Sequence, residues 1–144
     1  MRKVLFYFTA MAVALLLSGC MMNSKQMILE NAQQLEVRSY QVKNYPQPKL
    51  TTARAAVSAL QDLGFIVDKA DMETGTVTAT KLARFAAMKI TVVVREKSKQ
   101  ETTVRANAQF VSNTEMPKAV DDPETYEAFF SALDKAIFLE KQGL

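Results

Sequence analysis

The side chains that could carry acid–base chemistry in this sequence are mostly carboxylates. The 144 residues contain no histidine and one cysteine, Cys20. Histidine is the most common general base and metal ligand, and Ser–His and Cys–His nucleophile pairs both require it. The most conspicuous carboxylate pair is Asp121-Asp122, which directly precedes Pro123. An acidic residue before a proline favours the cap of a starting helix, so we interpret this doublet as a cap.

A second acidic group consists of Asp68, Asp71 and Glu73, which precede Gly75. These residues could line a cation site if folding gathered them, or they could form a solvated turn. The sequence is compatible with both interpretations. The glycines after the first twenty residues are isolated, so the sequence has no glycine-rich phosphate loop. The sequence therefore predicts a protein that is not an enzyme and that has no cofactor and no metal site.

Cys20 stands at the end of an apolar run that follows the basic residues Arg2 and Lys3. A basic start, an apolar stretch and a small residue before a cleavage point are typical of a secretory signal. The run 4–17 would cover roughly 21 Å as a helix, which is short of the ~30 Å core of a bilayer. We therefore expect residues 1–19 to be a cleaved signal peptide. The alternative is a retained anchor in which Cys20 is a small buried hydrophobe.

The four residues that end this run resemble the lipobox of bacterial lipoproteins, with the sequence Leu17, Ser18, Gly19, Cys20. The resemblance implies that signal peptidase II cleaves before Cys20 and that the cysteine is lipidated. Two or three acyl chains hold a protein firmly at a membrane. The residues that follow are Met21, Met22 and Asn23, without the aspartate that retains such proteins in the inner membrane. The resemblance thus implies that the protein is anchored in the outer membrane and faces the periplasm. Its membrane partner would be lipid, held through acylated Cys20.

The rest of the chain has the size of one domain. Removal of residues 1–19 would leave 16 basic and 15 acidic residues, a net charge of +1, so nucleic-acid binding has little support. Residues 20–34 are polar and contain several methionines, which indicates a lipidated N-terminus and tether. We expect a single α+β domain over residues 35–144.

The helix with the clearest pattern is expected to begin at a cap formed by Thr51 or Thr52 and to end at Gly64. Its apolar positions keep to one face: Ala53, Ala56, Val57, Leu60 and Leu63. A first strand is predicted over residues 35–42, because apolar and polar residues alternate there before two prolines.

Two hairpins are predicted between this helix and the last one. Residues 65–67 and 76–80 would pair through a turn at 72–75, and residues 88–94 and 103–111 would pair through 96–101. The resulting order β-α-β-β-β-β-α predicts a single antiparallel β-sheet with two helices on one face.

The last helix is predicted to open at Asp122-Pro123 and to carry an aromatic stripe at helical spacing: Tyr126, Phe129, Phe130, Leu133 and Ile137. A core-facing stripe explains this pattern, since aromatic side chains dominate core burial. Alternatively, one edge with Phe138 and Leu139 faces a partner or a lipid-like ligand.

The segment Ala59-Leu60-Gln61-Asp62-Leu63-Gly64-Phe65, with Gly75 and Thr80-Lys81 after it, resembles small uncharacterised proteobacterial lipoproteins, as does the closing Phe129-Phe130 and Ala136-Ile137-Phe138-Leu139-Glu140. The expected element order is also similar to the helix-grip domains of the outer-membrane protein assembly lipoprotein C. Both likenesses imply a fold and carry no chemistry.

Two classes of function follow. The first is a non-enzymatic accessory or structural subunit of a cell-envelope assembly, secretion or export complex, which would bind an envelope protein through a sheet edge or the last helix. The second is a periplasmic carrier of a lipid or cell-wall fragment. In the carrier, the hydroxyls of Thr76, Thr78 and Thr80 would line the binding site. Phe110 and Phe130 would form its apolar wall. Those threonines could equally be a solvent-facing strand surface.

Overall fold

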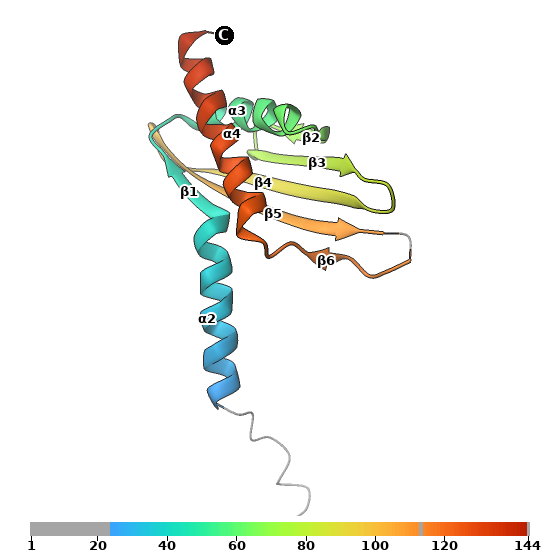
Figure 1. The fold of residues 1–144 in the computed structure, drawn as a ribbon. Coiled ribbons are helices and arrows are strands. Elements are labelled where there is room, and N and C mark those ends of the chain that lie inside the picture. The colour runs from blue at the N-terminus through green and yellow to red at the C-terminus, as the bar shows by residue number, and fades with distance from the viewer. Residues whose placement is uncertain (1–23, 113, 144) are drawn as a thin grey trace, which may run out of the picture. The chain divides into compact units, whose positions relative to one another are not determined.

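The computed structural model describes residues 24–112 and 114–143, and Figure 1 shows the fold. The elements follow in the order α2 (Ser24–Gln41), β1 (Val42–Tyr45), α3 (Lys49–Asp62), β2 (Ile66–Asp71), β3 (Thr76–Leu82), β4 (Ala87–Ser98), β5 (Glu101–Val111), β6 (Lys118–Ala119) and α4 (Pro123–Gln142). The predicted α+β class with one antiparallel sheet is confirmed. Within the described residues, no helix has both the length and the apolar character needed to cross a bilayer.

The six strands form one sheet in the order β1-β5-β4-β3-β2, and the short strand β6 pairs with the far end of β5. All pairings are antiparallel. The chain divides after Leu35 into two units, and the second unit, from Glu36 onward, contains the sheet, α3 and α4. In the first unit the structure describes the helical residues 24–35.

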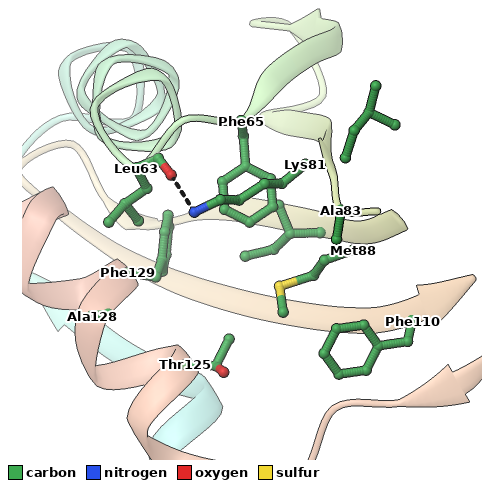
Figure 2. A pocket seen from close by; sticks show the side chains of 11 residues that line it. Leu63, Phe65, Lys81, Ala83, Met88, Phe110, Thr125, Ala128 and Phe129 are labelled. Carbon is green, nitrogen blue, oxygen red and sulfur yellow. Dashed lines mark hydrogen bonds between the residues drawn. The ribbon is translucent and has the colours of Figure 1, made fainter. Parts of the chain in front are cut away.

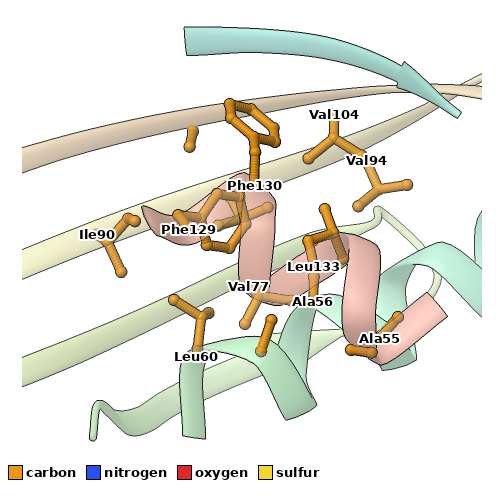
Figure 3. Packing of buried hydrophobic residues seen from close by; sticks show 14 of the residues in the cluster. Ala55, Ala56, Leu60, Val77, Ile90, Val94, Val104, Phe129, Phe130 and Leu133 are labelled. Carbon is orange, nitrogen blue, oxygen red and sulfur yellow. The ribbon is translucent and has the colours of Figure 1, made fainter. Parts of the chain in front are cut away.

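Helices α3 and α4 cover one face of the sheet, as predicted, and the core lies between them and the strands (Figure 3). Leu60 of α3 and Leu133 of α4 are fully buried against strand residues such as Val77. The inward residues of β3, β4 and β5 alternate with outward residues that are mostly polar, as expected for a sheet with one covered face. The predicted stripe on α4 is confirmed, since all five of its residues are buried: Tyr126, Phe129, Phe130, Leu133 and Ile137.

The predicted start of α3 is wrong. The N-cap is Pro48, and neither Thr51 nor Thr52 caps the helix. The Thr52 side chain is buried, where its hydroxyl donates to the Pro48 carbonyl at 3.1 Å and lies 3.1 Å from the Thr102 hydroxyl. Thr52 therefore joins the helix to β5 instead of opening it.

The predicted end of α3 at Gly64 is confirmed. Gly64 has φ +79°, a backbone conformation that favours glycine. The N–H of Phe65 donates to the Leu60 carbonyl at 2.9 Å, and the N–H of Gly64 donates to the Gln61 carbonyl at 2.9 Å. These two bonds satisfy carbonyls that a helix end leaves free, and they direct the chain straight into β2.

The predicted first strand over residues 35–42 is wrong for most of its length. Helix α2 continues to Gln41, and β1 is a short strand from Val42 to Tyr45. The helix has no buried apolar stripe, because Ile28, Leu29 and Leu35 are exposed. The periodic signal that identifies a helix in sequence is therefore weak here. Helix α2 and strand β6 bring the described part of the chain to three helices and six strands, more than the predicted order contained.

Both predicted hairpins are confirmed. Strands β2 and β3 join through the turn at residues 72–75, and β4 and β5 pair along most of their length. The second hairpin is longer than predicted, because β4 extends to Ser98 and β5 begins at Glu101. Its turn is therefore limited to residues 99–100.

Candidate functional site: an apolar pocket at one end of the sheet

A pocket of about 310 Å³ lies on the helix-covered side, between the end of α3, the start of α4 and the ends of β3, β4 and β5 (Figure 2). Most of its lining side chains are aliphatic or aromatic. The lining residues are Leu63, Phe65, Lys81, Leu82, Ala83, Met88, Ile90, Phe110, Thr125, Ala128 and Phe129.

Strand register places the pocket wall. Lys81 pairs with Met88, and Met88 pairs with Phe110, so these three residues form one row across β3, β4 and β5. Ile90, two residues further along β4, is buried and continues the same face of the sheet. Phe129 is also buried and reaches the pocket from α4. The deep part of the site thus belongs to the core, while Phe110 is partly exposed near its opening.

Lys81 is the one charged side chain among those that line the pocket. Its ammonium donates to the Leu63 carbonyl at 2.9 Å and lies 5.7 Å from the centre of the Phe65 ring (Figure 2). A cation near the last carbonyls of a helix is favourable, and so is a cation above an aromatic face. These contacts fix the ammonium at the pocket wall. An ammonium has three donors, so it keeps capacity for an anionic or polar group of a bound molecule.

The carboxylate doublet has the predicted capping role. Asp122 is the N-cap of α4, and its side chain accepts from the N–H of Glu124 at 3.2 Å and from the hydroxyl of Thr125 at 3.0 Å. The carbonyl of Asp121 accepts from the Tyr40 hydroxyl at 2.6 Å. Desolvation, with a smaller contribution from the charge of Asp121, raises the pKa of Tyr40. These contacts give the doublet a structural role at the start of the helix.

In the second acidic group, Asp71 closes the turn that contains Glu73, whereas Asp68 lies within β2. The Asp71 carboxylate accepts from the N–H of Thr74 at 2.9 Å and of Glu73 at 3.0 Å, and the bond from Thr74 is the main cause that lowers the pKa of Asp71. Asp68 accepts from the Thr80 hydroxyl at 2.6 Å. Across residues 24–112 and 114–143, no three His, Cys, Asp or Glu residues are grouped so that they could hold a metal ion.

The residues expected to line a carrier cavity do not form one site. Val77 and Ala79 are buried under the helices, so the alternating Thr76, Thr78 and Thr80 lie on the opposite face of the sheet.

The predicted apolar wall is divided as well. Phe130 belongs to the core, where its ring makes an edge contact with Phe129 at 5.1 Å between centroids. Of the residues expected to line a carrier cavity, Phe110 is the one that lines the pocket.

The lipobox residues Leu17, Ser18, Gly19 and Cys20 lie outside the described residues. No protein-family model matches the chain, and no curated protein matches it. The sequence reading missed the pocket because its lining comes from five separate elements.

Proposed function

We propose that this chain is a non-enzymatic lipoprotein, anchored in the outer membrane through acylated Cys20 and facing the periplasm. We further propose that it serves as an accessory subunit of a cell-envelope assembly, secretion or export complex. The supporting observation is the apolar pocket between α4 and the sheet, which offers a partner protein a preformed anchoring point.

The size of the pocket supports the anchoring of a side chain. Its volume of about 310 Å³ lies at the lower end of the ~300–1,000 Å³ range of small-molecule sites. One large apolar side chain of a partner fits this space. Such pockets, with dry apolar walls, are where a few residues carry most of the binding energy of an interface.

The free edge of β2 is a weaker docking site. Its pairing with β3 is shifted between Val67 and Lys69, and the charged residues Asp68 and Lys69 lie at this irregularity. Bulges and charges on an edge strand oppose the addition of another strand. Of the two surfaces expected from the sequence, the start of the last helix, which forms one wall of the pocket, is favoured.

The test is affinity capture from gently solubilised membranes, with intact mass measured on the captured chain. Ala128 is exposed on α4 and lines the pocket, so Ala128→Trp would fill the pocket without a change in the core. Lys135→Trp, seven residues later on the same helix, is the matched control.

We expect a mass that lacks residues 1–19 and includes added acyl groups. We also expect envelope proteins that co-purify with the wild type and with Lys135→Trp and are lost with Ala128→Trp. An uncleaved chain would refute the anchor, and equal capture by all three proteins would refute the pocket as the docking site.

A carrier of a lipid is the second candidate, and Lys81 is the observation that favours it. A single ammonium beside an apolar pocket suits an acyl chain that ends in an anionic group. Lipid extracted from the purified wild type and absent from Ala128→Trp, with no protein captured, would favour the carrier over the subunit.

A further inference from the structure

We infer that one end of the sheet docks onto the anionic surface of a phospholipid bilayer, with Phe85 and Met116 inserted among the headgroups. This docking end comprises the loop 83–86, residues 112 and 114–117, and the strand residues beside them. It is a second membrane contact, separate from the lipid at Cys20, and it adjoins the pocket, with which it shares Leu82, Ala83 and Phe110.

The exposed large hydrophobic side chains of the second unit gather at this end. Among the described residues from Glu36 onward there are eight of them, and five lie here: Ile66 (62% exposed), Leu82 (72%), Phe85 (86%), Phe110 (44%) and Met116 (89%). Strand pairing brings them together, because Ala87 at the start of β4 pairs with both Leu82 and Val111. The loops before β4 and after β5 are therefore neighbours. Scattered exposed hydrophobics need no explanation, whereas a cluster marks a contact surface.

The cluster surrounds the end of the sheet. Phe110 lies on the helix-covered face, in the row of Lys81 and Met88 that lines the pocket. Ile66 pairs with Thr80, which lies on the opposite face. Phe85 and Met116 are in the loops between these faces. A flat surface laid across the strand ends would touch both faces at once, whereas a peptide in the pocket would contact the helix-covered face only.

Charge at the docking end favours an anionic surface. The chain has no acidic residue between Glu73 and Glu96, and that stretch contains Lys81, Arg84 and Lys89 near the loop. Lys118, on β6, pairs with Phe110 and adds a fourth cation.

Three carboxylates lie near the same end of the sheet: Asp62 at the end of α3, Asp68 near the start of β2 and Glu115 in the second loop. Asp68 already accepts a hydrogen bond from Thr80. The docking end therefore keeps an excess of positive charge.

This combination is the one that binds membrane interfaces. Apolar side chains flanked by Lys and Arg insert into the boundary between headgroups and acyl chains, and anionic lipids attract the cations over about one Debye length. The loop that holds Phe85 is closed by a 2.8 Å hydrogen bond from the Ala83 N–H to the Ala86 carbonyl. The aromatic side chain is thus presented on a short, closed loop, so little ordering is needed on contact.

The test uses the full processed chain reconstituted into phosphatidylcholine vesicles with and without one quarter phosphatidylglycerol. Phe85→Cys receives a polarity-sensitive fluorophore, and lipids with a nitroxide near the headgroup act as quencher. The matched control is Phe138→Cys on α4, which is as exposed as Ile66 and lies outside the docking end. Both positions are exposed, so neither substitution threatens folding.

We expect at least threefold stronger quenching at position 85 than at position 138 in the anionic vesicles. The difference should shrink in phosphatidylcholine alone, at high salt, and in an Arg84→Glu/Lys89→Glu background. Equal quenching at the two positions, or a difference insensitive to anionic lipid, would overturn the inference.

A thiol-labelling experiment in native membranes separates a protein partner from the bilayer. One possible result is that a water-soluble maleimide fails to label Phe85→Cys in native membranes, although the fluorophore at position 85 is not quenched in anionic vesicles without other proteins. That result would mean that a protein covers this end, and the inference would be wrong. Intact mass reports on Cys20 separately. A chain without acyl groups would refute the proposed anchor, and the quenching difference could still be read in a Cys20→Ser background.

Discussion

The hydroxyl of Tyr126 donates a 2.6 Å hydrogen bond to the carbonyl oxygen of Val120. The same hydroxyl accepts from the Gln41 side chain at 3.1 Å and from the Ala108 N–H at 3.2 Å. Tyr126 is fully buried, and Gln41 and Val120 are nearly so. One oxygen therefore joins the end of α2, strand β5 and the segment that leads into α4, and it satisfies polar groups that have no access to water.

Tyr126→Phe should destabilise the domain by about 1–3 kcal/mol, because it leaves the Val120 carbonyl, the Gln41 amide and the Ala108 N–H without this partner in the interior. Urea unfolding would measure the loss. A variant as stable as the wild type would contradict the network.

Tyr45→Phe is the matched variant with the opposite expectation. The Tyr45 hydroxyl is buried without a hydrogen-bond partner among the described residues. Replacement of an unpaired buried hydroxyl by hydrogen is neutral or stabilising, so we expect no loss at neutral pH.

Tyr45 should also make the wild type sensitive to alkali. Burial, together with the nearby charge of Asp134, raises the pKa of Tyr45 in the folded state. The raised pKa contributes stability below the unfolded value of about 10, and this contribution decreases as the pH rises above that value. Tyr45→Phe should therefore lose less stability than the wild type between about pH 9 and 11. Equal pH profiles would show that Tyr45 plays no part in alkaline unfolding.

Gly75→Ala should be the most damaging of the glycine substitutions. Gly75 has φ +75°, and a Cβ there would lie 2.3 Å from the Val94 carbonyl oxygen. Val94 cannot easily move away, because its N–H donates a hydrogen bond to the Gly75 carbonyl. Gly143 has a similar φ of +72° but open space around a Cβ, so Gly143→Ala isolates the backbone cost of about 1–2 kcal/mol. We expect Gly75→Ala to exceed about 3 kcal/mol, as measured by denaturant midpoints. Similar losses at both sites would contradict the clash.

Elements with strong local signals could be predicted from the sequence. The stripe from Tyr126 to Ile137 and the Asp122 cap identify α4, and Gly64 identifies the end of α3. The β2–β3 hairpin follows from the turn that ends at Gly75, and the β4–β5 hairpin follows from two runs of alternating residues on either side of a polar segment. In these segments local propensity, pattern and tertiary packing agree, which is why the sequence suffices.

Other features depend on distant partners. Thr52 reads as a helix cap because threonine prefers that position, yet Thr102, fifty residues later, provides the hydroxyl that keeps it buried. Strand β1 pairs with β5, and no local pattern in residues 35–45 encodes that choice. The pocket combines Leu63, Met88 and Phe129 from three elements, so it becomes visible only when the sheet register is known.

The Thr52–Thr102 contact should show strong coupling. Thr52→Val alone leaves the Thr102 hydroxyl unpaired in the core and should cost about 1–3 kcal/mol, whereas Thr52→Val with Thr102→Val should cost clearly less than the sum of the single changes. A double-mutant cycle from urea unfolding measures this coupling. Additive effects would mean that the two hydroxyls do not stabilise one another.

Asp71 should make the β2–β3 turn sensitive to acid. Its folded-state pKa is lowered, chiefly by the hydrogen bond from the Thr74 N–H, so the ionised form stabilises the turn. This stabilisation is present above the unfolded pKa of about 3.9 and is lost as the pH falls through the lower folded value. Asp71→Asn should weaken the domain at neutral pH and flatten its stability profile below about pH 4. Asp62→Asn on the exposed end of α3 is the control, and an equal response of the two variants would show that acid sensitivity arises elsewhere.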